Sequence, residues 1–289
     1  MKVLITGGGG MLGRKLARKL LDGTELVAPD GTMATVDRLV LFDAVHPDDA
    51  IEDDPRVTQI TGDITDRATV GAVVDRETAS IFHFAAVVSG AAEADFDLGY
   101  EVNLDGSRHV LEAARWNCEV PRVLFTSSLA AYGGNRHIDD STQLTPRTSY
   151  GVQKATGELL VNDYTRKGFI DGRTLRLPTI VVRPGKPNKA ASGFASSILR
   201  EPLQGRRAVC PVSPETCMLI MSPRRVVEAF VHMHNLPGDK LGPVRTVLLN
   251  GISPSIGEMI DALRAMTAPA IADLVDWEPD PAIQLIVDE

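Results

Sequence analysis

The sequence predicts an α/β protein, a doubly wound parallel sheet followed by a smaller mixed C-terminal lobe. Three observations predict it: short β-branched runs alternate with helical patterns, a glycine-rich turn follows the first run, and the alternation stops after Pro184. With 289 residues, of which 44% are hydrophobic and 24% charged, the chain is long enough to bury a sizeable core.

The predicted strands are short apolar runs, at residues 3–5, 38–42, 57–61, 80–84 and 122–126. Helical spacing of apolar residues lies between them, for example over residues 11–21 and 98–114. Strands that alternate with helices form parallel sheets, so helices must cover both faces. After Pro184 the pattern is less regular, with helices near 226–234 and 256–266 and a strand at 244–249. We therefore expect one domain over residues 1–180 and a substrate-binding lobe over residues 181–289, interleaved with it, at the carboxyl ends of the strands.

The composition disfavours several classes of function. The net charge of −8 leaves no strong basic field, so a nucleic-acid partner is not expected. No run of about 18 apolar residues occurs, which predicts no membrane association and a cytoplasmic location. The 3 cysteines form no CxxC pair and the 6 histidines are scattered, so we expect a reducing compartment and no metal site.

The first strand runs into TGGGGMLG and then a helix, which places glycines at Gly7, Gly10 and Gly13. In this context the first glycine allows a tight turn, the second lets the backbone approach a pyrophosphate, and the third lets the helix pack closely. A flexible loop is the alternative, which the flanking strand and helix disfavour. The motif predicts a Rossmann-type NAD-binding domain over residues 1–180.

Asp43 ends the second long strand, where a carboxylate can accept hydrogen bonds from the adenosine ribose hydroxyls and repel a 2′-phosphate. This favours NAD over NADP; an ordinary strand-end acid is the alternative. Asp43 lies 30 residues beyond Gly13, against about 20 in the usual motif. We attribute the excess to a surface insertion between Asp22 and Val36.

Tyr150 and Lys154 stand at i and i+4 on one face of a predicted helix. Such a pair is common by chance, but Ser128 ends a buried strand and can point into the same cleft. To act as a general base near neutral pH, Tyr150 needs a pKa about 3 units below 10, or about 4 kcal/mol. A lysine ammonium about 4 Å away supplies roughly that amount. We therefore expect Lys154, with the positive nicotinamide ring, to lower the pKa of Tyr150, while Ser128 holds the substrate oxygen.

Six ordered motifs across the chain resemble those of the extended short-chain dehydrogenase/reductases, also called the NAD-dependent epimerase/dehydratase family. They are TGGGGMLG at residues 6–13, GDI at 62–64, HFAA at 83–86, VNLDG at 102–106, SSLAAYG at 127–133 and YGVQK at 150–154. The resemblance implies catalysis by Tyr150, Lys154 and Ser128. It also implies NAD contacts from Gly7, Gly10, Met11, Leu12, Gly13, Asp43, Asp63, Ile64, Ala85, Asn103, Tyr150, Lys154, Leu177 and Ile180.

Departures from the family pattern narrow the expected chemistry. Leu129 and Ala130 stand where dehydratases of this family carry an acidic pair, so dehydration is not expected. Arg224 and Arg225 replace two acids of the nucleotide-sugar epimerases. Basic side chains near the cleft suit a small carboxylate, although a solvated basic face is the alternative. The expected substrate contacts are Ser89, Ser128, Tyr150, Arg183, Lys189 and Arg224.

Residues 183–194 and 210–215 resemble one branch of the family, which oxidises the four-carbon sugar acid D-erythronate at C2. The resemblance implies that Tyr150 removes the C2 hydroxyl proton as a hydride passes to NAD, which gives a 2-oxo acid. The alternatives are a nucleotide-sugar 4-epimerase that uses the same three residues and a non-catalytic NAD-binding scaffold. The resemblance also implies a homodimer that pairs helices 98–114 and 150–167 across a two-fold axis.

Overall fold

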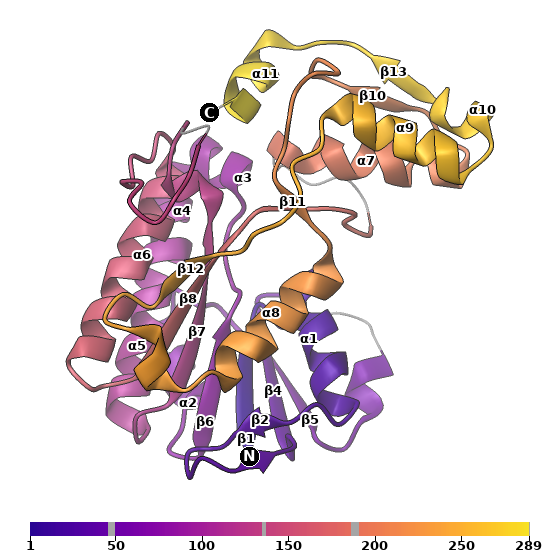
Figure 1. The fold of residues 1–289 in the computed structure, drawn as a ribbon. Coiled ribbons are helices and arrows are strands. Elements are labelled where there is room, and N and C mark those ends of the chain that lie inside the picture. The colour runs from indigo at the N-terminus through magenta and orange to yellow at the C-terminus, as the bar shows by residue number, and fades with distance from the viewer. Residues whose placement is uncertain (46–49, 135–136, 186–190, 289) are drawn as a thin grey trace.

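A computed structural model describes residues 1–45, 50–134, 137–185 and 191–288. Its centre is a parallel sheet of seven strands in the order β12-β8-β7-β6-β1-β4-β5 (Figure 1). The strands are β1 (Lys2–Thr6), β4 (Arg38–Asp43), β5 (Val57–Thr61), β6 (Thr78–His83), β7 (Arg122–Ser128), β8 (Asp171–Leu177) and β12 (Thr246–Leu248). The predicted doubly wound α/β fold is confirmed.

Helices cover both faces of the sheet, because alternate strand residues point to opposite sides. On one face α1 (Met11–Leu21) and α8 (Pro223–Asn235) bury Leu16 and Phe230 against Ile5. On the other face α2 (Arg67–Val73), α5 (Gly106–Asn117) and α6 (Ser149–Arg166) pack against the neighbouring residue Leu4. Each layer thus has its own apolar core.

Two segments differ in detail from the expected elements. The insertion expected between Asp22 and Val36 forms a small antiparallel hairpin of β2 (Leu26–Val27) and β3 (Met33–Ala34). The helix expected over residues 98–114 is interrupted: α3 (Ser89–Ala94) and α4 (Phe96–Gly99) lead into a π-helical turn, Tyr100–Asp105, before α5. Such π-helical turns often occur at functional sites.

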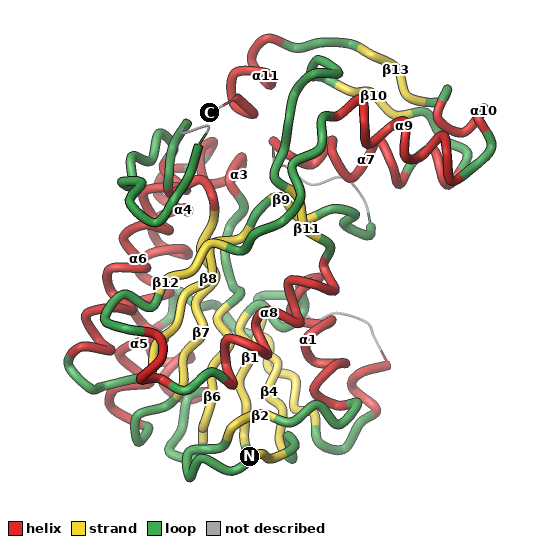
Figure 2. Tube along the Cα trace, viewed as in Figure 1, coloured by secondary structure: helices red, strands yellow, loops and turns green. Residues whose placement is uncertain are grey.

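The small lobe lies beyond the carboxyl ends of the sheet (Figures 1 and 2). It contains α7 (Phe194–Arg200), β10 (Ala208–Cys210), α9 (Ile256–Met266), α10 (Pro269–Ala272), β13 (Val275–Trp277) and α11 (Pro281–Asp288). These elements have a core cluster of their own, which includes Ile198, Val212 and Ile260. The short strands β9 (Thr179–Ile180) and β11 (Ile220–Met221) pair where the two parts meet. Two elements after residue 180, α8 and β12, pack with the large sheet. The lobe is formed by α7, β10, α9, α10, β13 and α11.

Five 3₁₀ turns complete the described elements, at Ala50–Asp53, Leu129–Ala131, Ala191–Gly193, Pro202–Gln204 and Gly238–Leu241. In the part of the chain that the structure describes, none of the helices has the length and apolar character needed to cross a membrane.

Candidate active site

The loop between β1 and α1 has the geometry that a pyrophosphate requires. Gly7 adopts a positive φ of +71°, and a Cβ on Gly13 would lie 2.3 Å from the carbonyl oxygen of Gly7. Gly10 is the N-cap of α1 and provides no side-chain hydrogen bond to the first turn. The backbone N–H groups at the start of α1 therefore remain available to an anion, which the helix dipole also favours.

Asp43 lies beside this loop, because β4 pairs with β1. Its Oδ2 accepts a hydrogen bond of 2.9 Å from the backbone N–H of Gly9, and its Oδ1 accepts one of 3.2 Å from that of Val45. The β2–β3 hairpin accounts for the long spacing between Gly13 and Asp43. The loop and the carboxylate together fit the adenosine half of a dinucleotide.

The other expected NAD contacts follow the carboxyl ends of successive strands. Asp63 is exposed and Ile64 is buried just after β5, while Ala85 follows β6 and donates its N–H to Thr6 Oγ1 at 3.4 Å. Leu177 ends β8 and Ile180 ends β9; both are buried in one core cluster. Met11 and Leu12, in the first turn of α1, are partly buried.

Asn103 lies in the π-helical turn and is almost fully buried. Its Oδ1 accepts from the N–H of Val87 at 2.8 Å, while its Nδ2 donates to the carbonyl of Val87 at 3.1 Å and to Gln153 Oε1 at 2.7 Å. Both amide hydrogens of Asn103 are therefore used inside the protein, and the side chain fixes the loop after β6. Gln153 stands inside the YGVQK motif, but its residue type alone does not mark it as a site residue.

A second buried chain of hydrogen bonds, which no sequence pattern predicts, runs through His83. His83, in the HFAA motif, lies 2.6 Å from Thr6 Oγ1 through Nδ1 and 2.9 Å from Ser107 Oγ through Nε2. Ser107 in turn donates to the carbonyl oxygen of Asn103 at 2.6 Å. Burial lowers the pKa of His83 to about 3, so the ring is neutral. The chain connects the glycine-rich loop to the π-helical turn.

Tyr150 and Ser128 meet at the start of α6. Thr148 caps this helix, and the Ser128 hydroxyl lies close enough to the Tyr150 phenol to form a hydrogen bond. Burial raises the pKa of Tyr150 to about 12, while the charge of Arg183 and the Ser128 hydrogen bond oppose that change. The expectation that Lys154 lowers the pKa of Tyr150 is wrong for the chain alone, because desolvation outweighs the nearby charges.

Lys154 is 3% exposed, and its Nζ lies 5.6 Å from the centroid of the Tyr150 ring. Burial lowers the pKa of this ammonium to about 8, and the charge of Glu158 on the next helical turn opposes the change. Lys154 is thus near the tyrosine, but the cation that acts on the phenol is Arg183.

Arg183 follows β9 and its side chain is held in place by the main chain and the lobe. Its Nε donates to the carbonyl of Ile180 at 3.1 Å and its Nη2 to Ser192 Oγ at 3.3 Å. Ser89 begins α3, on the segment after β6, and is partly buried. Lys189, the other basic residue expected in the substrate site, lies outside the described residues.

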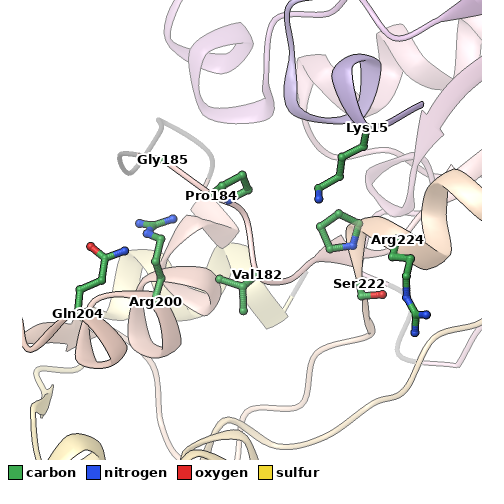
Figure 3. Close-up of a pocket in the computed structure, with 9 residues that line it drawn as sticks. Lys15, Val182, Pro184, Gly185, Arg200, Gln204, Ser222 and Arg224 are labelled. Carbon is green, nitrogen blue, oxygen red and sulfur yellow. The ribbon is translucent and has the colours of Figure 1, made fainter. Parts of the chain in front are cut away.

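Arg224 lines a cavity of about 560 Å³ (Figure 3). Arg224 belongs to the first turn of α8, and the cavity lies between α8, α1 and the end of α7. It is lined by Lys15, Val182, Pro184, Gly185, Arg200, Gln204, Ser222, Pro223 and Arg224. The structure therefore brings Arg183, but not Arg224, to Tyr150. Among the described residues, no group of three or more His, Cys, Asp or Glu side chains could hold a metal ion.

Comparisons with known proteins agree with this geometry. Over 289 residues the chain is 54% identical to the D-erythronate dehydrogenase of Cupriavidus necator, covering 99% of this chain and 88% of that protein. It is 46% identical to the D-erythronate dehydrogenase of Haemophilus influenzae, covering 99% and 89%. A solved nucleoside-diphosphate-sugar epimerase from Agrobacterium tumefaciens has a TM-score of 0.91 at 40% identity, covering 100% of this chain and 84% of that one.

An L-threonine dehydrogenase from Clostridium difficile has a TM-score of 0.84 at 25% identity, covering 100% of this chain and 86% of that one. These findings confirm the expected NAD cofactor and the expected class of enzyme, an NAD-dependent dehydrogenase. Residues 3–234 match the NAD dependent epimerase/dehydratase family, and with these relatives they show that the chain belongs to that family.

Proposed function

We propose that this enzyme oxidises the C2 hydroxyl group of a small sugar acid, D-erythronate or a close analogue, to the 2-oxo acid. Two relatives that match 99% of the chain bear the name D-erythronate dehydrogenase. The observation that carries the proposal is the position of Arg183, a partly buried cation close enough to Tyr150 to act on its phenol. A 2-hydroxy acid carries its carboxylate one bond from the reacting carbon, so one ligand can reach both side chains.

Bound NAD supplies the hydride acceptor. Tyr150 Oη is the proposed base that takes the C2 hydroxyl proton, and Ser128 donates a hydrogen bond to the same substrate oxygen. Because burial raises the pKa of Tyr150 to about 12, positive charge near the phenol favours the tyrosinate. Arg183 is the cation of the chain that we assign to this task. Lys154 stays a proposed catalytic residue, with its ammonium near the Tyr150 ring.

Arg183 also binds the substrate carboxylate in this proposal. Its Nε and Nη2 donate to Ile180 and Ser192, which fix the guanidinium, and its other N–H groups can bind a carboxylate. The C2 hydroxyl then lies at the phenol. Lys189 and Ser89 stay predicted substrate contacts, whereas Arg224 lines the cavity beside α1 and α8.

The alternative is a nucleotide-sugar 4-epimerase, since the Agrobacterium protein carries an epimerase title. An epimerase returns the hydride to its substrate, so it accumulates no NADH. Residues Leu129 and Ala130 supply no acid for dehydration. A non-catalytic scaffold is disfavoured because Ser128 and Tyr150 converge in the structure.

NADH absorbance tests the proposal directly. The enzyme and NAD are mixed with D-erythronate, with other four-carbon 2-hydroxy acids, and with UDP-glucose as comparison. Steady NADH production from a four-carbon acid is the expected result. Tyr150→Phe should abolish turnover and leave the Kd of NAD nearly unchanged. No NADH from any acid, together with conversion of UDP-glucose to UDP-galactose, would replace the proposal with the epimerase.

A homodimer stays part of the proposal. The helical segments expected at its interface expose large apolar side chains, namely Phe96, Leu98, Trp116 and Leu159. A two-fold axis would bury these against a second copy. Sedimentation should give a dimer at micromolar concentration, and a monomer alone would contradict this. We also infer a cytoplasmic location, because the three cysteines are free.

A further inference from the structure

A buried charged cluster lies next to the catalytic side chains, on the sheet-facing side of α6. Glu158 stands one helical turn beyond Lys154 and is 2% exposed. Arg176 donates to its carboxylate twice, with Nε–Oε1 at 2.9 Å and Nη2–Oε2 at 2.6 Å, and the Ser127 hydroxyl donates to Oε1. Arg176 Nη1 also donates to Tyr132 Oη at 2.5 Å. The cluster thus joins α6 to the ends of β7 and β8.

Two members of the cluster are next to residues of the proposed site. Ser127 precedes Ser128, and Arg176 precedes Leu177, one of the expected NAD contacts. A buried ion pair adds little net stability compared with apolar packing of the same volume. The buried charge of Glu158 therefore matters chiefly through its effect on the ionisation of neighbouring groups.

The Lys154 ammonium has few polar neighbours. Its Nζ lies 5.1 Å from the centroid of the Phe125 ring and 5.6 Å from that of Tyr150. Within the described ranges, Nζ forms no hydrogen bond and no ion pair shorter than 4 Å with the protein. A buried ammonium without such partners loses its proton readily, unless a nearby negative charge stabilises it.

The charged and titratable groups around Lys154 come from several elements. Tyr150 lies on the same helix, and His83 on β6 is neutral. On α3, Glu93 accepts from the N–H of Ser149 at 2.8 Å. On α5, Glu112 is bound to Tyr164 near the far end of α6. On β8, Arg176 is paired with Glu158. Glu158 is the anion whose charge acts on the ammonium.

We propose that Glu158 is a positioning residue of this site, whose buried carboxylate keeps the Lys154 ammonium protonated during the reaction. The inference rests on the proposed function, which gives Lys154 a part in the chemistry. Burial lowers the pKa of Lys154 to about 8 even with the opposing charge of Glu158 present. Loss of that charge leaves the lysine neutral over more of the working pH range.

The test is the pH dependence of kcat/KM for the sugar acid in Glu158→Gln, which keeps the shape and removes the charge. The alkaline limb should move to lower pH by about one unit. At pH values above the wild-type limb, kcat/KM should therefore be about tenfold lower than in the wild type. Near pH 6.5 the loss should stay within about threefold. A loss by the same factor at every pH, with the limb in place, would mean that Glu158 is only structural and would overturn the inference.

Further variants make the test secure. Glu112→Gln removes another partly buried carboxylate bonded to α6, and its alkaline limb should match that of the wild type. Glu158→Gln/Arg176→Met removes both members of the ion pair, so no buried arginine is left unpaired if the single variant does not fold. The alkaline limb of the double variant should lie at lower pH than that of Arg176→Met, because both variants lack the arginine charge and only the double variant also lacks the carboxylate. Equal limbs in these two variants contradict the inference.

Failure of the inference can be separated from failure of the proposed function. If Tyr150→Phe and Lys154→Met both abolish NADH production while Glu158→Gln leaves the limb in place, only the inference fails. If Lys154→Met turns over the sugar acid at the wild-type rate, the proposed catalytic role of Lys154 fails, and the inference with it.

Discussion

Arg183 and Tyr150 approach each other from two different parts of the chain and affect each other's ionisation. Arg183 lies after β9, where the chain enters the small lobe, and Tyr150 lies in the first turn of α6. The charge of Arg183 lowers the pKa of Tyr150, and the phenolate would in turn raise the pKa of Arg183, which burial lowers. One guanidinium can therefore favour the tyrosinate and bind an anionic substrate.

Arg183→Gln should raise the KM for the sugar acid by about 10- to 100-fold, the effect of losing a hydrogen bond to a charged group. Removal of the cation also raises the pKa of Tyr150, so the acid limb of kcat should move to higher pH. Arg183→Lys should recover part of the affinity, because it keeps the charge but not the planar fork. The Kd of NAD should not change. An unaltered KM in Arg183→Gln would contradict the carboxylate role.

Asp43→Ser should weaken discrimination between NAD and NADP. The carboxylate accepts from Gly9 beside the expected ribose position, where it would repel a 2′-phosphate. We expect the ratio of kcat/KM for NAD over NADP to fall by about 10- to 100-fold, since ionic hydrogen bonds contribute about 1.5 to 3 kcal/mol. Asp30→Ser removes an exposed carboxylate from the β2–β3 hairpin and is the matched control. An unchanged ratio in Asp43→Ser would exclude the assigned role.

Gly13→Ala should reduce NAD affinity and the free energy of unfolding. The added Cβ would lie 2.3 Å from the carbonyl oxygen of Gly7, which the backbone must move to relieve. Overpacking of this kind costs about 1 to 3 kcal/mol. Gly71→Ala is the control, because its Cβ would meet nothing within 4 Å. Inside α2 it should stabilise the protein by about 0.5 to 1 kcal/mol in urea unfolding.

Acidification should destabilise the fold through two buried histidines. Burial lowers the pKa of His83 and of His234 to about 3, so both are neutral in the folded chain. The unfolded chain binds a proton at each near pH 6.5, so this stability is complete above about pH 6.5 and is lost as the pH falls. Proton binding at each histidine of the unfolded chain should lower the free energy of unfolding by about 2 kcal/mol between pH 7 and pH 5.

Urea unfolding at the two pH values checks this dependence. His234→Gln should remove about half of the loss between pH 7 and pH 5, whereas His232→Gln, on the exposed side of the same helix, should remove little. Equal losses in the wild type and His234→Gln would show that His234 is not the titrating group.

The fold and the NAD-binding loop could be predicted because they depend on local sequence. Neighbouring apolar residues such as Leu4 and Ile5 predict a strand that is buried on both faces. In the structure Ile5 and Leu4 pack in separate cores, each covered by its own layer of helices. Gly13 is required by contacts with Gly7 and Gly8 in the same loop, and the positive φ of Gly7 belongs to that loop's tight turn. By contrast, the π-helical turn before α5 holds Asn103 in buried hydrogen bonds with Val87 and Gln153, which are distant in sequence and form only in the folded chain.

The parallel sheet, the glycine-rich turn, the place of Asp43 at a strand end and the spacing of Tyr150 and Lys154 can all be read from the residue order, because periodicity and chain geometry are local properties. Which charges meet depends on the folded chain. Folding brings Arg183 to Tyr150, places Arg224 in a cavity with Lys15, and buries Glu158 with Arg176. These contacts cannot be read from the residue order, because desolvation and Coulomb energy depend on burial and on distances between segments that the chain order does not fix.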